Sequence, residues 1–361
     1  MGFVPRLAFA AGNSPHEETV SAVRADHLYK VFGRQSQAAV ERLADGSHRD
    51  TIADLDVTAA VIDVSFEVQP GEIFVVMGLS GSGKSTLIRM LNGLLEPTAG
   101  SVEVDGVNIT ALNKKDLLKL RGEKISMVFQ HFALLPHRTV LENAAYGLEL
   151  RGMPRAERFE KAKKTLALVG LDGWEDKLPQ QLSGGMQQRV GLARALAADT
   201  DIILMDEAFS ALDPLIRRDM QTQLIELQAS LGKTIIFITH DLNEAMRLGD
   251  RICVLRDGRV AQIGEAAEIL NSPANDYVER FIEDVDRSRV LTASSVIDAS
   301  VAKDDSAPQV DAGTAVADLF SSVSTSDRLR VVSDQGEVLG MVTRESVLAS
   351  LNTNTNGEES K

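Results

Sequence analysis

The chain has 361 residues, and its 38 lysines and arginines against 52 aspartates and glutamates give a formal charge of −14, with 44% hydrophobic residues. This is the composition of a folded globular protein of about two domains, and its acidity disfavours non-specific binding to nucleic acid or anionic lipid. Cys253 is the only cysteine, which excludes an internal disulfide or a cysteine-based metal cluster and favours a reducing compartment.

No apolar run reaches the roughly 20 residues that span a bilayer. The start of the chain has Pro5 where a signal peptide needs an unbroken apolar core, and Arg6 where a myristoylation motif needs serine or threonine. We therefore expect a cytoplasmic protein that does not cross a membrane by itself. Residues 1–20 lack periodicity and are expected to form a flexible leader.

Short apolar runs alternate with helical patterns along most of the chain. Strands are predicted at residues 26–32, 61–68, 72–77, 202–205, 234–239 and 251–255. Helices are predicted at residues 38–54 and 84–94 and over most of 131–182. Because all-apolar strands that alternate with helices are typical of parallel sheets covered on both faces, the pattern predicts an α/β fold.

A glycine-rich loop between the strand at 72–77 and the helix at 84–94 matches the phosphate-loop pattern. Its glycines let backbone N–H groups point at phosphate oxygens at the positive end of the helix. Lys84 is placed to reach the β- and γ-phosphates, and the Ser85 hydroxyl to coordinate Mg²⁺. The residues expected to bind nucleotide here are Gly78, Ser80, Gly81, Ser82, Gly83, Lys84, Ser85 and Thr86.

The apolar run 202–205 ends in two carboxylates, Asp206 and Glu207. This places them at the carboxyl edge of the predicted sheet, where a nucleotide binds. Asp206 is expected to hold Mg²⁺, directly or through water. Glu207 is expected to be the general base that polarises a water near the γ-phosphate. A solvated acidic loop is the alternative, which the upstream phosphate loop disfavours.

The sequence Ser183-Gly184-Gly185 precedes another helical pattern, where a hydroxyl and a bare backbone at a helix start can approach a phosphate closely. Together with the phosphate loop and the acidic strand end, it resembles the signature motif of ABC ATPases. In that family the signature contacts the ATP held by the opposite subunit. The resemblance therefore implies a homodimer that binds ATP and Mg²⁺ at its interface.

The other motifs of that family follow in the same order along the chain. By resemblance, Gln130 senses Mg²⁺ and water, His240 holds the γ-phosphate, Asp213 lines the dimer seam, and the ring of Phe32 stacks on adenine. The implied site has Glu207, His240 and Gln130 as catalytic residues and Ser85, Gln130 and Asp206 as metal ligands.

Residues 78–86, 129–136, 182–196 and 205–217 are similar to ATPase subunits of glycine betaine/proline-type importers, within a likeness that spans about residues 23–285. The resemblance implies an ABC-type P-loop ATPase with a RecA-like core, an antiparallel β subdomain and a helical subdomain at about 131–182. It also implies hydrolysis of ATP to energise import of a quaternary amine of the glycine betaine, proline or choline class.

The same resemblance implies partners at the cytoplasmic face of the plasma membrane: a second ATPase subunit, integral-membrane permease subunits and, indirectly, a periplasmic or extracellular substrate-binding protein. No nucleic-acid partner is implied. We expect the apolar side chains Phe132, Leu134 and Leu135 to contribute to a docking groove for the permease, the alternative being ordinary core of the helical subdomain.

A stretch rich in Ser, Ala and Asp at 286–310 predicts a linker after an ATPase domain at 21–285. Beyond it, strands at 328–333 and 337–342 and a helix at 344–351 resemble the end of a CBS module. Residues 311–351 have room for a single such module, and Ser346 stands where an adenosine-binding CBS motif has aspartate. We expect this acidic part, which ends in a disordered tail at 352–361, to help dimerisation or to modulate the ATPase.

Several alternatives stay open. The imported solute can also be histidine or a proline betaine. A non-transport ABC ATPase is disfavoured, because tandem ATPase units and long coiled coils are missing from the sequence. A purely regulatory nucleotide-binding module is disfavoured, because Gln130, Glu207 and His240 are all in place.

Overall fold

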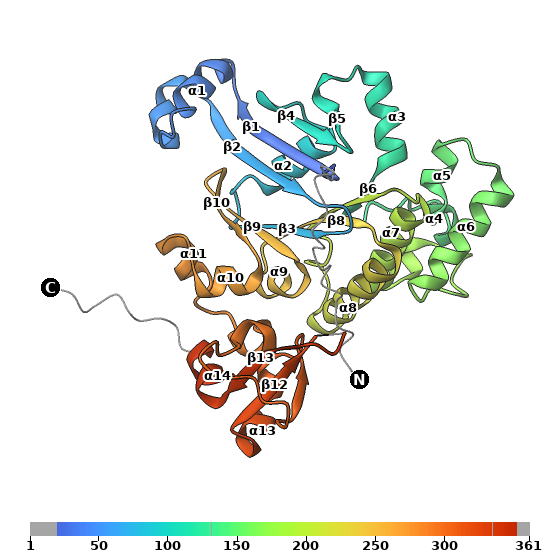
Figure 1. Cartoon of the computed structure of the whole chain (residues 1–361). Helices are drawn as coiled ribbons and strands as arrows, with labels where there is room; N and C mark the ends of the chain where they lie inside the picture. Colours follow the sequence, from blue (N-terminus) through green and yellow to red (C-terminus); the bar gives the residue numbers. More distant parts are fainter. Residues whose placement is uncertain (1–19, 131, 334, 352–361) are drawn as a thin grey trace. The chain divides into compact units, whose positions relative to one another are not determined.

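The computed structural model describes residues 20–130, 132–333 and 335–351 (Figure 1). The expected tail at 352–361 and the expected leader up to residue 19 lie outside these ranges. The chain divides into two compact units, which we call the N-terminal unit (residues 20–263) and the C-terminal unit (residues 264–351). Within the described ranges, no helix is both long enough and apolar enough to cross a membrane.

The N-terminal unit contains two β-sheets. The strands of the first are β1 (Val23–Phe32), β2 (Thr58–Val68), β4 (Ala99–Val104) and β5 (Val107–Asn108). The strands of the second are β3 (Ile73–Met77), β6 (Ile125–Phe129), β7 (Ile202–Asp206), β8 (Thr234–Thr239), β9 (Arg251–Arg256) and β10 (Arg259–Gly264). The first sheet is antiparallel, with the order β2-β1-β4-β5, and the second has the order β10-β9-β3-β8-β7-β6.

The second sheet confirms the predicted parallel architecture. Strands β9, β3, β8, β7 and β6 all run in one direction. Every residue of β3 and of β8 is buried, as expected for strands covered on both faces.

Helices connect these strands. In the N-terminal unit they are α1 (Ser36–Leu43), α2 (Lys84–Leu91), α3 (Lys114–Lys124), α4 (Val140–Ala144), α5 (Tyr146–Leu150), α6 (Arg155–Leu168), α7 (Gly184–Ala197), α8 (Pro214–Leu231) and α9 (Leu242–Leu248), with 3₁₀ turns η1 (Arg49–Leu55), η2 (Ile109–Ala111) and η3 (Pro179–Gln181). Apolar side chains of α2, such as Leu87 and Ile88, join a core cluster with residues of both sheets. Within this cluster the ring of Phe66 from β2 stacks on the ring of Phe74 from β3, with 4.9 Å between the ring centres. The two sheets therefore share one core.

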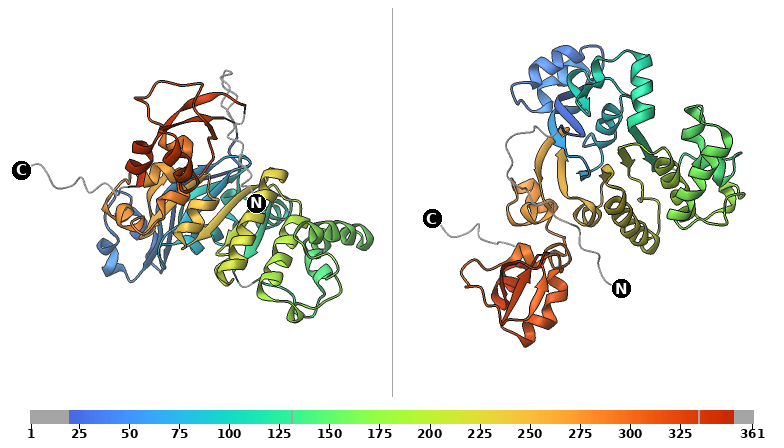
Figure 2. Two further views of the ribbon diagram at one scale, coloured as in Figure 1. Left: turned by 90° about the horizontal axis from the view of Figure 1, so that it is seen from below. Right: turned by 45° about the vertical axis from the view of Figure 1, so that its right-hand side comes forward.

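Two helical parts flank the sheets. The helix predicted at 38–54 is present as two shorter elements, α1 and η1, which bury Leu43, Ile52 and Leu55 against Tyr29 of β1. The segment expected to be helical at 131–182 contains α4, α5, α6 and η3, and α7 packs against α4 and α6. We call α4–α7 the helical region, and it lies at the opposite end of the N-terminal unit from α1 (Figures 1 and 2).

The C-terminal unit has a three-stranded sheet with helices. Its elements are α10 (Ala266–Asn271), α11 (Asp276–Phe281), α12 (Arg287–Val290), η4 (Ala293–Val296), β11 (Gln309–Asp311), α13 (Val316–Thr325), β12 (Arg328–Val332), β13 (Val338–Thr343) and α14 (Arg344–Leu351). The sheet order is β11-β12-β13, with β11 parallel and β13 antiparallel to β12.

The stretch expected as a linker, residues 286–310, is folded over its first half. It contains α12 and η4, and Leu291 and Ala293 are fully buried. Arg287 of α12 also donates to the carbonyl of Leu270 in α10, and α12 packs against α13 and α14. The boundary between the compact units therefore falls after Ile263 and not near residue 285, because α12 ties α10 to the C-terminal helices.

Candidate active site

Four neighbouring strands of the parallel sheet end at the same edge. In the order β3, β8, β7, β6, Met77 lies opposite Thr239, Ile238 opposite Asp206, and Asp206 opposite Phe129. The next residues along these strands are expected site residues, listed here by strand: Gly78, His240, Glu207 and Gln130. Strand register therefore gathers residues that are far apart in the sequence.

The phosphate loop between β3 and α2 requires glycine at two of its positions. Gly78 has a φ of +152° and Gly83 a φ of +100°. A Cβ at Gly78 would lie 2.3 Å from the carbonyl oxygen of Leu255, and one at Gly83 would lie 2.2 Å from that of Ala60. The bare backbone thus fits into space that no side chain can enter, directly before the first turn of α2.

Lys84 and Ser82 form the inside of this loop. The Lys84 ammonium is buried and donates to the carbonyl oxygens of Gly78 and Leu79, at 2.8 and 3.0 Å. Burial lowers the pKa of Lys84, and the nearby carboxylates of Glu207 and Asp206 partly offset this effect. The Ser82 hydroxyl is buried without a hydrogen-bond partner. A buried cation and an orphaned hydroxyl beside a helix N-terminus fit a phosphate group.

Oxygen ligands suited to a divalent cation lie beside the loop. Burial raises the pKa of Asp206, the neighbouring Glu207 raises it further, and a hydrogen bond from Ser85 acts in the opposite direction. Among the described residues, no group of three or more His, Cys, Asp and Glu side chains is placed to hold a metal. The donor set at this point is instead a carboxylate and a hydroxyl, with the amide of Gln130 nearby, which suits Mg²⁺ as a hard cation.

Glu207 is the centre of the polar cluster. Its Oε2 accepts from Gln130 Nε2 at 3.3 Å and lies 3.2 Å from His240 Nδ1. The Glu207 backbone has a φ of +43°, which is rare outside glycine, and its N–H donates to the carbonyl of Ile238 in β8. This conformation turns the carboxylate towards both neighbouring loops.

Ser210 joins this cluster, and the sequence patterns gave it no role of its own. Its hydroxyl accepts from Gln130 Nε2 at 3.1 Å and donates to the Glu207 carbonyl at 2.9 Å. The signal that could have found it is its position in the Ser210-Ala211-Leu212-Asp213 segment, four residues before the next helix.

The signature residues and Asp213 lie at two other helix starts. Ser183 caps α7 by accepting from Met186 N, and Asp213 caps α8 by accepting from the N–H groups of Leu215 and Ile216. Ser183, Gly184 and Asp213 are exposed. A Cβ at Gly185 would lie 2.6 Å from Ile216 Cγ2, so this glycine lets α7 approach α8.

The last predicted nucleotide contact is Phe32, at the end of β1. Its side chain is 44% exposed, and the ammonium of Lys30 lies 5.3 Å from its ring centre. A large exposed aromatic ring is available for stacking. Of the remaining phosphate-loop residues, Ser80 and Gly81 are exposed and Thr86 lies in the first turn of α2.

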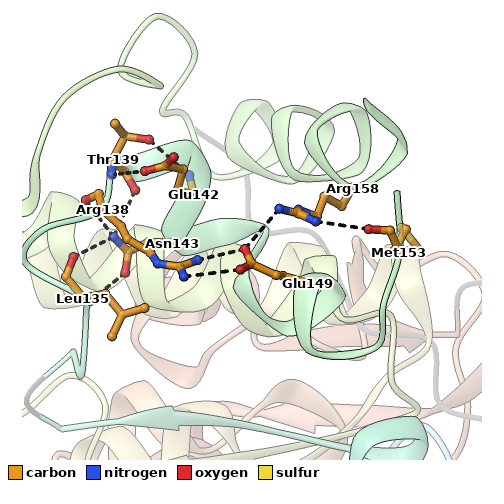
Figure 3. Close-up of polar contacts among 8 residues, drawn as sticks. All are labelled: Leu135, Arg138, Thr139, Glu142, Asn143, Glu149, Met153 and Arg158. Atoms are coloured by element: carbon orange, nitrogen blue, oxygen red, sulfur yellow. Dashed lines mark hydrogen bonds and ion pairs between the residues drawn. The ribbon is translucent and has the colours of Figure 1, made fainter. Parts of the chain in front are cut away.

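The segment after Gln130 is fastened to the helical region (Figure 3). The fully buried side chain of Asn143 accepts from Leu135 N and donates to the carbonyls of Leu135, Arg138 and Thr139. Glu149 accepts from Arg138 and from Arg158. These hydrogen bonds join the segment after Gln130 to α4 and α5.

The apolar residues expected in a docking groove lie in this segment. Phe132, Leu134 and Leu135 are all half-buried. Phe132 and Ala133 have positive φ values of 57° and 48°, and Arg194 of α7 donates to both of their carbonyls. Their side chains are thus partly available at the surface, and the docking role stays a prediction.

The parallel sheet carries a phosphate loop and an acidic strand end, and a helix beside it starts with Ser-Gly-Gly. Together these features define a nucleoside triphosphatase of the P-loop class. Residues 61–210 match the family model described as ABC transporter. The chain is 56% identical over 296 residues to the glycine betaine transport ATP-binding protein OpuAA of Bacillus subtilis. The match covers 81% of this chain and 71% of that protein. It therefore belongs to the ATP-binding proteins of ABC transporters.

Two further similarities are informative. The chain is 47% identical over 327 residues to the trimethylamine N-oxide transport system ATP-binding protein TmoW of Ruegeria pomeroyi, covering 90% of this chain and 96% of that one. Among solved structures, the dimeric post-hydrolysis state of the ATP-binding cassette MJ0796 bound to ADP and Pi matches with a TM-score of 0.58 and 33% identity, over 68% of this chain and 98% of that one.

These findings confirm the family and the ABC ATPase fold that the sequence motifs indicated. Proteins of this family are ATPases, and this chain is an ATP-binding, ATP-hydrolysing member of it. An ATPase dimer that works with a membrane permease is consistent with the family.

Proposed function

We propose that this chain is the ATPase subunit that energises import of a small quaternary amine, at the cytoplasmic face of the plasma membrane. The observation that carries the solute class is the 56% identity to a glycine betaine transport ATP-binding protein over most of the chain. Two copies of the chain, two permease subunits and, indirectly, a substrate-binding protein would form the working assembly.

In the proposed hydrolysis, the phosphate loop and Lys84 bind the β- and γ-phosphates of ATP. The Glu207 carboxylate accepts a hydrogen bond from a water and takes its proton as the water oxygen attacks the γ-phosphorus. The new P–O bond forms as the bond to the β,γ-bridging oxygen breaks. Glu207 suits this role because its carboxylate lies between Gln130 and His240 and is partly exposed, at 19% of the side chain.

His240 and Gln130 orient this reaction. His240, which follows β8 and has a side chain that is 56% exposed, would donate a hydrogen bond to an oxygen of the γ-phosphate. Mg²⁺, when bound, would neutralise charge on the phosphate oxygens, with Ser85, Asp206 and Gln130 as the residues that hold it. Phe32 would stack on the adenine ring.

Each copy would complete the site of the other. Ser183 and Gly184 are exposed at the N-terminus of α7, where backbone N–H groups attract phosphate. We propose that they contact the γ-phosphate of the ATP held by the partner copy, with Asp213 at the seam.

Trimethylamine N-oxide is a second candidate solute. The match to TmoW extends over 90% of this chain and 96% of that protein, whereas the match to OpuAA covers 71% of that protein. Coverage therefore favours the N-oxide system, while identity favours the betaine system. Both solutes are small methylated amines without net charge.

The test is ATP-driven uptake into proteoliposomes that contain the full complex. Labelled glycine betaine, trimethylamine N-oxide, choline, proline betaine and histidine are offered in turn. We expect Glu207→Gln to lower uptake and hydrolysis by about 100-fold or more while ATP binding persists. Glu226→Gln, which changes an exposed glutamate of α8, is the matched control. Hydrolysis without uptake of any of these solutes would reject the solute class but not the ATPase.

A further inference from the structure

Arg217, in the first turn of α8, is joined to the loop that follows Glu207. Its Nε donates to the carbonyl of Phe209 at 3.2 Å. Its Nη2 donates to the carbonyls of Ser210 and Leu212, each at 3.2 Å. One guanidinium therefore holds three backbone positions between the proposed general base and Asp213 at the proposed seam.

The same guanidinium reaches the loop that carries His240. Arg217 Nη1 donates to Oδ2 of Asp241 at 3.2 Å. Asp241 follows His240 directly, and its other oxygen, Oδ1, caps α9 by accepting from Glu244 N at 3.1 Å. Both oxygens of this carboxylate are thus engaged, one by α9 and one by α8.

A second set of hydrogen bonds, through Thr239 and Glu244, also fixes the His240 loop. Asp241 N donates to Thr239 Oγ1 at 2.9 Å, and this hydroxyl donates in turn to the buried carboxylate of Glu244. Gln221 of α8 donates to the other oxygen of Glu244 at 3.0 Å. A short turn with this many anchors has little freedom except as a unit with α8 and α9.

We propose that Arg217 is a positioning residue that couples the loop of Glu207 to the loop of His240, so that both groups take their reactive places together. This inference rests on the proposed hydrolytic function. Four donations from one side chain explain why arginine is needed, since lysine has no planar fork to span separate carbonyls. The pair with Asp241 is partly exposed, with 27% and 32% of the side chains accessible, so its contribution to stability is small.

Misplacing Glu207 or His240 by about 1 Å is enough to lower turnover strongly without weakening ATP binding. We therefore expect Arg217→Gln in the full chain to lower kcat for ATP about tenfold or more. The KM for ATP and the equilibrium affinity for a fluorescent ATP analogue are expected to change less than about threefold. Arg217→Lys, which keeps the charge near Asp241, is expected to recover only part of the loss.

Arg218→Gln is the matched control, because Arg218 is the next residue of α8 and is exposed. It makes the same change of charge and is expected to keep the unmodified kcat. Asp241→Asn provides an independent test, since its amide oxygen can still cap α9 while the ion pair with Arg217 is lost. The losses in kcat of Arg217→Gln and Asp241→Asn are expected to be far from additive in the double variant.

An Arg217→Gln chain that keeps the unmodified kcat would overturn the inference. So would a loss that is matched by weaker ATP binding, or losses of Arg217→Gln and Asp241→Asn that simply add. If Arg217→Gln does not fold, as judged by thermal unfolding, Asp241→Asn decides by the same kcat and KM measurements. Failure of the proposed function itself would appear separately, as a Glu207→Gln chain that hydrolyses ATP at the unmodified rate.

Discussion

Gly83 is the residue with the least room in the phosphate loop. Its φ of +100° costs an L-residue about 1–2 kcal/mol, and a Cβ would press on the carbonyl oxygen of Ala60. We predict that the Gly83→Ala chain loses nucleotide binding and unfolds at a lower urea concentration than the unmodified chain. Gly152→Ala is the control, because Gly152 also has a positive φ, +76°, but open space around it.

Equal effects of the two substitutions would show that backbone strain alone, and not the close contact with Ala60, matters at Gly83. Urea unfolding followed by the fluorescence of Trp174, together with titration of a fluorescent ATP analogue, measures both quantities. Trp174 is the only tryptophan of the chain, so its signal is unambiguous.

Residues in local motifs could be assigned from the sequence, whereas those defined by distant partners could not. Lys84 and Glu207 lie in short sequence motifs, so a few neighbouring residues are enough to predict their roles. Ser210 and Arg217 were not assigned, because Ser210 hydrogen-bonds to Gln130 across 80 positions and Arg217 to Asp241 across 24. Such pairs depend on strand order and helix packing, which no local pattern contains. Cys253 is fully buried, and burial raises the pKa of its thiol to about 12.

At the scale of elements, the link between the Gln130 segment and α4 gives a prediction. Asn143→Ala removes all four hydrogen bonds of the buried amide, and each buried group left unpaired costs about 1–3 kcal/mol. Asn113→Ala is the control, because Asn113 is an exposed amide that caps α3, where the loss is about 1 kcal/mol. We expect Asn143→Ala to shift the Trp174 transition clearly further than Asn113→Ala, and a smaller shift would contradict this role.

Strands β3, β7, β8 and β9 of the parallel sheet were predicted closely because each is a largely apolar run, such as 72–77 for β3, whereas β6 was not predicted. β1 starts three residues before its predicted position. His27 has a φ of +46° there, and the pairing register of β1 shifts on both sides of the first sheet, so the two-residue alternation is broken. α12 and η4 were missed because elements of four residues are too short to show a periodicity.

At the scale of the whole molecule, the proposed shared site predicts complementation between two inactive variants. Lys84→Ala removes the phosphate-loop lysine, and Ser183→Arg blocks the signature at an exposed position. Each variant alone is expected to be inactive. A mixed pair of the two keeps one site with both groups intact, so random pairing would restore about one quarter of the unmodified activity.

Specific ATPase activity of equimolar mixtures, measured against each variant alone at the same total concentration, checks this prediction. The control mixture combines Lys84→Ala with Glu207→Gln, both on the same side of the proposed site, and should stay inactive. No recovery in the first mixture, when both variants still bind to the unmodified chain, would place the signature outside the hydrolytic site.

The placement of β3 in its sheet has a consequence for synthesis of the chain. Its two neighbours, β8 and β9, both come from residues 234–256, so β3 at 73–77 has no partner when it leaves the ribosome. At typical rates of translation the delay is on the order of 10 s. During that time a fully apolar strand can pair wrongly with other nascent chains. The interval in which this protein is open to misassembly is thus set by where β8 and β9 stand in the sequence, and not by the strength of the finished sheet.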